Sequence, residues 1–222
     1  MTGGDAATRS RAAGYFQRCL LVWAESNRRD FPWRNKTDSY SVIIAEMMLR
    51  RTQARQVVPV YNRFLQLYPD VRALAHSTDG QVASVVRPLG LSWRAPSFRA
   101  MAKAIIASHE GRFPNDRKAL MSLPGVGEYV ADAVRCLVLD QPGPIVDTNT
   151  VRVAARYLGF KYNAESRRRT SVRSAVSQLI GERHPRVANL AILDFAALVC
   201  TAKSPKCNVC PVRRRCTYFA QR

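Results

Sequence analysis

The sequence lacks any long hydrophobic run. No stretch of its 222 residues approaches the about 20 consecutive apolar residues that a membrane-spanning helix requires. The first residues, MTGGDAATRSRAAG, also lack the apolar segment of a signal peptide. We therefore expect no membrane partner and a cytoplasmic location, and the small, polar residues 1–13 predict a disordered tail.

Acidic residues are scarce. The chain has 16 Asp and Glu against 35 Lys and Arg, a formal net charge of +19. Such an excess favours a polyanionic partner, and nucleic acid is the first candidate. A histone-like or ribosomal packing protein would share this charge, but 47% hydrophobic residues in periodic segments indicate a globular body.

The sequence also lacks convincing strand patterns. Apolar residues recur at helical spacing in the segments 15–23, 40–48 and 98–106. Proline-containing breaks separate such segments at residues 31–33, 68–70, 88–90, 113–115 and 141–144. The expected fold class is all-α.

Four of the six cysteines lie close together near the C-terminus, spaced Cys200-x6-Cys207-x2-Cys210-x5-Cys216. A disulfide framework is disfavoured because the cytosol keeps thiols reduced. Four thiolates in one short segment suit an iron–sulfur cluster or zinc. Four-cysteine zinc loops usually pair two C-x2-C knuckles, and this segment has one, so the spacing favours the iron–sulfur cluster without excluding zinc.

Two glycines lead into a predicted helix over residues 128–137, in the run Leu123-Pro124-Gly125-Val126-Gly127. The free amides of a helix N-terminus suit a phosphate, although a structural tight turn would give the same pattern. A second helix start follows at Val146-Asp147-Thr148-Asn149. The aspartate is placed to cap that helix.

The LPGVG run, the aspartate that follows it and the cysteine spacing together resemble the helix-hairpin-helix DNA glycosylases, the superfamily of endonuclease III and the adenine glycosylases. The resemblance extends from Phe31-Pro32-Trp33-Arg34 through residues 46–53, EMMLRRTQ, to Cys216. It implies a two-lobed all-α fold with a C-terminal 4Fe-4S loop. Residues 35–142 would form a helical barrel with the hairpin, and residues 14–34 plus 143–222 a second helical domain holding the cluster.

The resemblance also implies the roles of individual residues. Asp147 would stabilise the positive charge that develops on the sugar during glycosidic cleavage. Asn149 would position the sugar or water, or simply start the helix. Glu46 would recognise thymine or protonate a purine leaving group. The remaining DNA contacts would come from the hairpin glycines Gly125 and Gly127 and from Arg51, which would enter the duplex.

Three positions bear on which base is removed. The bifunctional relatives have a lysine two residues after the second hairpin glycine, whereas this chain has Tyr129, which cannot form a Schiff base. A tyrosine at this position resembles the G/T mismatch thymine-DNA glycosylases, whereas adenine glycosylases typically have a serine there. Leu190 replaces the glutamine of adenine glycosylases, and Gly90-Leu91-Ser92 replaces their Gly-Tyr-Tyr, with Leu91 as a candidate wedge into the base stack.

These comparisons predict a monofunctional enzyme that removes thymine or uracil opposite guanine. Its partner would be double-stranded DNA with a mismatched base, and it would act as a nucleoid-associated monomer. The chain stops at Arg222, soon after Cys216, without the extra domain of full-length adenine glycosylases. The alternatives are an adenine glycosylase acting on A/G or A/8-oxoguanine pairs, and a catalytically inactive protein that binds DNA lesions.

Overall fold

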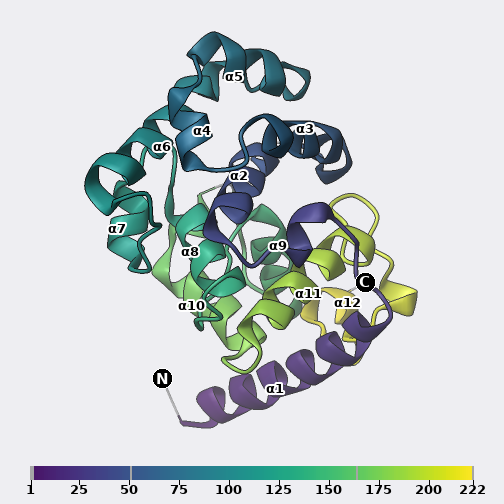
Figure 1. Cartoon of the computed structure of the whole chain (residues 1–222). Coiled ribbons are helices and arrows are strands. Elements are labelled where there is room, and N and C mark those ends of the chain that lie inside the picture. The colour runs from purple at the N-terminus through teal and green to yellow at the C-terminus, as the bar shows by residue number, and fades with distance from the viewer. Residues whose placement is uncertain (1–2, 51, 164, 222) are drawn as a thin grey trace. The chain divides into compact units, whose positions relative to one another are not determined.

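A computed structural model describes residues 3–50, 52–163 and 165–221, with side chains from Ser10 onward. Within these ranges the regular structure consists of α-helices and short 3-10 helices, and no strand is present (Figure 1). The all-α prediction is therefore confirmed. Proline and glycine occupy several of the connections, as at Gly90 and Gly159, where the backbone is left-handed.

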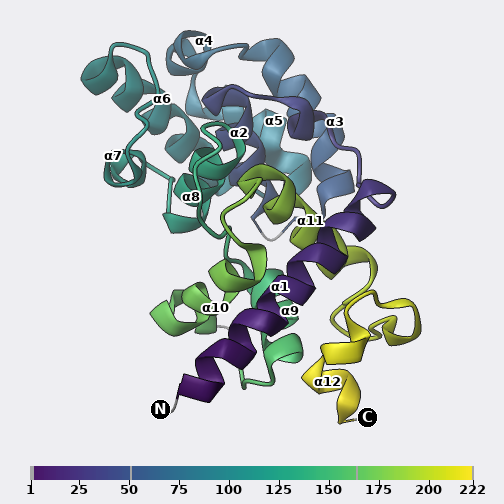
Figure 2. The same cartoon turned by 90° about the horizontal axis from the view of Figure 1, so that it is seen from below.

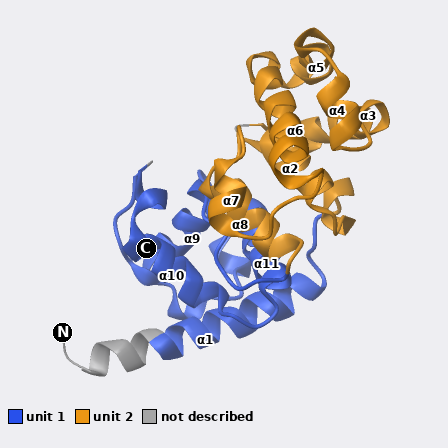
Figure 3. Ribbon diagram, turned by 60° about the vertical axis from the view of Figure 1, so that its left-hand side comes forward, with its two compact units in different colours: residues 1–29, 140–222 blue, residues 30–139 orange. Residues whose placement is uncertain are grey.

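The chain divides into two compact units (Figure 3). Unit 1 combines residues 1–29 with residues 140–222, and unit 2 is formed by residues 30–139. The sequence placed the domain bounds at 34/35 and 142/143, and that assignment stays a prediction.

Unit 2 is built around α2 (Ser39–Leu49), which is buried along nearly its whole length, from Tyr40 to Met48. A helix that its neighbours cover on every face is mostly apolar, and Ser41 and Glu46 are the buried polar residues of α2. It packs against α3 (Ala54–Leu67) and α8 (Glu128–Leu137). The other elements of unit 2 are η1 (Pro32–Asn35), α4 (Val71–His76), α5 (Asp79–Val86), η2 (Arg87–Leu89), η3 (Ser92–Arg94), α6 (Ala95–His109) and α7 (Arg117–Ser122).

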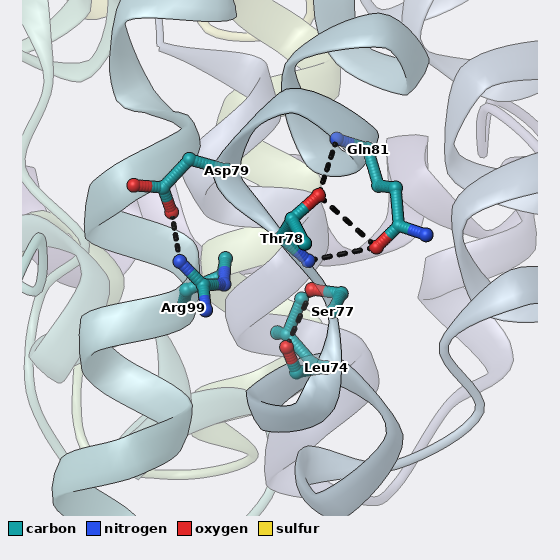
Figure 4. A network of polar contacts seen from close by, with 6 residues as sticks. All are labelled: Leu74, Ser77, Thr78, Asp79, Gln81 and Arg99. Atoms are coloured by element: carbon teal, nitrogen blue, oxygen red, sulfur yellow. Dashed lines mark hydrogen bonds and ion pairs between the residues drawn. The ribbon is translucent and has the colours of Figure 1, made fainter.

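Polar contacts fix the start of α5, which follows α4 in the chain and packs against α6 (Figure 4). Thr78 and Gln81 form a capping box, in which the Thr78 hydroxyl accepts from the Gln81 amide and the Gln81 side chain accepts from the Thr78 amide. Asp79 pairs with Arg99 of α6 at 2.5 Å. These contacts supply partners for helix-end amides and orient α5 against α6.

Unit 1 gathers both ends of the chain around α1 (Gly3–Glu25), which packs against α10 (Thr170–Ile180) and α11 (Pro185–Leu198) (Figure 2). Its core includes Phe16, whose ring centroid lies 4.8 Å from that of Tyr157 and 6.1 Å from that of Phe195. The other elements of unit 1 are α9 (Thr148–Leu158), η4 (Ser166–Arg168), η5 (Cys207–Val209), η6 (Arg213–Arg215) and α12 (Thr217–Ala220).

The disordered tail predicted for residues 1–13 is corrected from Gly3 onward, because α1 begins there. Alanine is the best helix former, and this segment contains several. Ala13 is buried in the core of unit 1, and the Tyr157 hydroxyl donates to the Ala12 carbonyl at 2.9 Å. The segment has no large apolar residues, so its sequence shows no apolar helical pattern. Small side chains such as alanine nevertheless allow a helix to pack closely.

Candidate active site

The predicted hairpin lies in unit 2 between α7 and α8. Gly125 has φ +81°, and a Cβ there would lie 2.8 Å from Met47 Cε and 3.1 Å from Ser97 Cβ. The left-handed backbone therefore favours glycine, and a Cβ would also require the flexible end of Met47 and the nearby Ser97 to shift. Gly127 is the N-cap of α8, is exposed, and has nothing within 4 Å of where a Cβ would be. Gly127 therefore lies at an open surface at the start of α8.

Arg117 braces the hairpin by joining α7 to α8. Its guanidinium Nε lies 2.7 Å from Asp132 Oδ1, and its Nη2 lies 3.5 Å from Glu128 Oε2. The hydrogen bond to Asp132 is the main cause that raises the pKa of Arg117. Glu128, an acidic residue beside a predicted phosphate site, is thus partly neutralised by Arg117 within unit 2.

Two predicted catalytic residues lie on the packed helices α2 and α8. Glu46 is 5% exposed and directly precedes Met47, which reaches the hairpin at Gly125. Tyr129 lies half-buried in the first turn of α8. Unit 2 therefore brings the hairpin, Tyr129 and the helix of Glu46 together. Arg51 lies outside the described residues.

Asp147 caps α9 in unit 1, as the sequence predicts. Its Oδ1 accepts from the backbone amides of Asn149 at 2.9 Å and Thr150 at 2.7 Å. Its Oδ2 accepts from the Asn149 side-chain amide at 2.6 Å. The carboxylate is half-buried and fixed by three donors, so its orientation is set before any substrate binds.

Asn149 is itself held by Arg152, a buried residue that the sequence analysis missed. Arg152 Nη1 donates to Asn149 Oδ1 at 2.9 Å, which leaves the Asn149 NH2 to face Asp147. The same guanidinium donates to the carbonyls of Cys200 at 3.0 Å and Ala196 at 3.0 Å. A continuous chain of hydrogen bonds thus runs from the Asp147 carboxylate to the backbone of the first clustered cysteine.

The four clustered cysteines line one pocket in unit 1. Its walls are largely apolar, and Arg156 lies at its edge, with Nη1 3.5 Å from Cys200 Sγ and 2.7 Å from the Thr201 carbonyl. Burial raises the pKa of the Cys210 thiol to about 11. Four soft sulfur donors around a common pocket fit the chemistry of an iron–sulfur cluster.

In the described part of the chain, no group of three or more His, Cys, Asp or Glu side chains is arranged to hold a metal ion.

The two apolar positions predicted to contact DNA differ in their surroundings. Leu91 is 4% exposed and lies in the core of unit 2, so this structure does not display it as a wedge. Leu190 is half-buried on α11. Its neighbour Asn189 is fully buried, accepts from the Ile145 amide and donates to the Gly143 carbonyl, and so holds the segment that leads to Asp147.

The chain belongs to the HhH-GPD superfamily of base excision DNA repair proteins, whose family profile matches residues 44–178. It is 34% identical to the thymine/uracil-DNA glycosylase of Methanothermobacter thermautotrophicus over 97% of both chains. It is 38% identical to the thymine-DNA glycosylase of Aeropyrum pernix, with 91% of this chain and 93% of that one covered. A solved structure of a thermostable thymine-DNA glycosylase superposes with a TM-score of 0.90 at 32% identity, covering 96% of this chain and 98% of that one.

These findings confirm the predicted helix-hairpin-helix fold and the assignment as a DNA N-glycosylase. Among the described helices, none has the length and apolar character needed to cross a bilayer.

Proposed function

We propose that this chain hydrolyses the N-glycosidic bond of thymine or uracil mispaired with guanine in double-stranded DNA. The observation that carries the proposal is Tyr129 at the start of α8, where a Schiff-base enzyme needs a lysine. The relatives with which this chain shares nearly its whole length are named for the removal of thymine or uracil, which supports the same substrate.

Asp147 supplies the electrostatic part of the reaction. As the bond between the sugar and the base breaks, positive charge develops at the anomeric carbon, and a fixed carboxylate stabilises it. Water adds its oxygen to that carbon, and the departing base takes the bonding electrons and then a proton. Because Asn149 and the α9 amides hold the carboxylate in place, little reorganisation is needed at the transition state.

Recognition of the base falls to unit 2 in this proposal. Glu46, when ionised, accepts the N3 hydrogen of a flipped thymine or uracil. The exposed Gly127 and the first amides of α8 bind a backbone phosphate. Leu190 on α11 and Arg51 remain proposed DNA contacts. We also propose that the protein acts as a nucleoid-associated monomer.

A panel of duplexes containing G/T, G/U, A/G or A/8-oxoguanine tests the substrate. After incubation and alkali, we expect strand breaks only at the thymine or uracil of the guanine-containing pairs. Breaks confined to adenine would establish an adenine glycosylase instead. Tight mismatch binding without any breaks would establish an inactive lesion-binding protein.

We further propose that Cys200, Cys207, Cys210 and Cys216 hold a 4Fe-4S cluster. When bound, the cluster cross-links the C-terminal loop and supplies a redox-active centre. The four sulfurs around the apolar pocket support the proposal, and zinc is the alternative. Protein purified without oxygen should show a broad visible absorbance band, with iron and sulfide in equal amounts. Zinc alone in such protein would contradict the proposal.

A further inference from the structure

Trp93 is the most exposed large apolar side chain in the described part of the molecule. It is 71% exposed, whereas Trp33 is 7% exposed and Leu91, two residues before Trp93, is 4% exposed. A tryptophan ring carries a large apolar surface, and leaving it in water forgoes the free energy of burying it. An aromatic ring displayed in this way marks a candidate contact surface.

The turn that carries Trp93 is firmly held. Trp93 lies in η3, and the Arg94 guanidinium lies 4.6 Å from its ring centroid. Arg94 is itself 7% exposed, and its Nη1 donates to the carbonyls of Met47 at 3.1 Å and Arg50 at 3.4 Å. The adjacent Ser92 hydroxyl donates to the Ala83 carbonyl at 3.3 Å. Trp93 is therefore presented from a fixed position beside the C-terminal end of α2.

The chemistry around the ring favours nucleic acid over another protein. Arg94 covers one face of the ring, and the high exposure of Trp93 leaves the other face accessible. Arg50, whose carbonyl accepts from Arg94, is exposed at the C-terminal end of α2, and the whole chain carries a net charge of +19. Aromatic rings combined with arginine on a basic surface stack on nucleobases, because every base has an apolar π-face and every nucleotide a phosphate.

We propose that Trp93 is the side chain that stacks on a DNA base, in the role that the sequence assigned to Leu91. Leu91 instead packs beneath the turn and supports it. The inference rests on DNA being the substrate, which membership of the family establishes, and does not depend on which base is removed. Stacking by Trp93 fills space in the base stack and so stabilises the extruded state of the target nucleotide.

The test compares W93A, W93F and V22A for binding to a mismatched duplex and for thermal stability. Val22 is 66% exposed on α1, so V22A removes a similarly exposed apolar side chain from another surface. Stacking predicts an about 5- to 150-fold higher Kd for W93A, a smaller change for W93F, and no change for V22A. All three variants should unfold at the wild-type temperature because the substituted side chains are exposed.

Tryptophan fluorescence gives a second measurement, which compares only W93F with the wild type. Duplex binding should quench part of the wild-type tryptophan emission, and W93F should lose that quenching. Unchanged duplex affinity in W93A, or equal quenching in W93F and the wild type, would overturn the inference. Loss of self-association in W93A with unchanged duplex affinity would instead identify a protein contact. The test measures duplex binding and not base release. A protein that does not release thymine would therefore contradict the proposed function without deciding whether Trp93 stacks on DNA.

Discussion

At the scale of single residues, the Asp147 carboxylate is the most demanding assignment, because Asp147 also caps α9. Asparagine is an equally good helix cap but carries no charge. We therefore expect D147N to keep the bonds to the helix amides but to lose the bond from the Asn149 side chain, at a cost of about 1 kcal/mol of unfolding free energy. Single-turnover base release should fall by at least about 10²-fold. Base release at the wild-type rate would show that the aspartate serves only the helix.

Tyr129 permits a test in which a substitution adds an activity that the wild type lacks. A lysine there would supply an amine that can attack the sugar and form an imine. We expect Y129K to give a protein–DNA adduct that borohydride traps, whereas the wild type and Y129F give none. An adduct with the wild type would contradict the monofunctional assignment.

The two hairpin glycines should respond differently to the same substitution. In G125A the new Cβ meets Met47 at a left-handed backbone position, so we expect a loss of about 1–3 kcal/mol of unfolding free energy. In G127A the backbone is extended and the surroundings are open, so stability should hardly change. Thermal unfolding measures both, and an equal loss would contradict this account of the hairpin.

At the scale of elements, Arg152 joins α9 to the end of α11. Replacing it in R152M leaves the carbonyls of Cys200 and Ala196 and the Asn149 side chain without their donor. We expect a loss of about 2–4 kcal/mol of unfolding free energy, slower base release and less iron per chain. R168M removes an exposed arginine paired only locally with Glu165, and it should match the wild type in all three measurements.

Elements with local signals were predictable, and those with distant partners were not. The Asp147 cap and the hairpin glycines lie within a few residues of the helices they start, so the sequence revealed them. The two backbone carbonyls that Arg152 binds lie 44 and 48 residues away, and Asn189 binds the Ile145 amide 44 residues away. Such pairings depend on how helices pack. Likewise, the pattern around Leu91 located the turn that we propose to contact DNA but did not reveal that Trp93 is its exposed side chain.

At the scale of the whole molecule, the positive charge should govern DNA affinity. Each phosphate that Lys or Arg neutralises releases a counterion, so the affinity falls as salt rises. With a net charge of +19, we expect the Kd for duplex DNA to rise at least about 10²-fold between 50 and 200 mM salt. An affinity nearly independent of salt would contradict a binding surface made mainly of phosphate contacts.

The most direct test of the central claim is to identify the products of one turnover on a G/T duplex by mass spectrometry. The account predicts free thymine and an unbroken strand with an abasic site. Release of adenine from an A/G duplex with none of thymine from G/T, or a strand already broken without alkali, would contradict it.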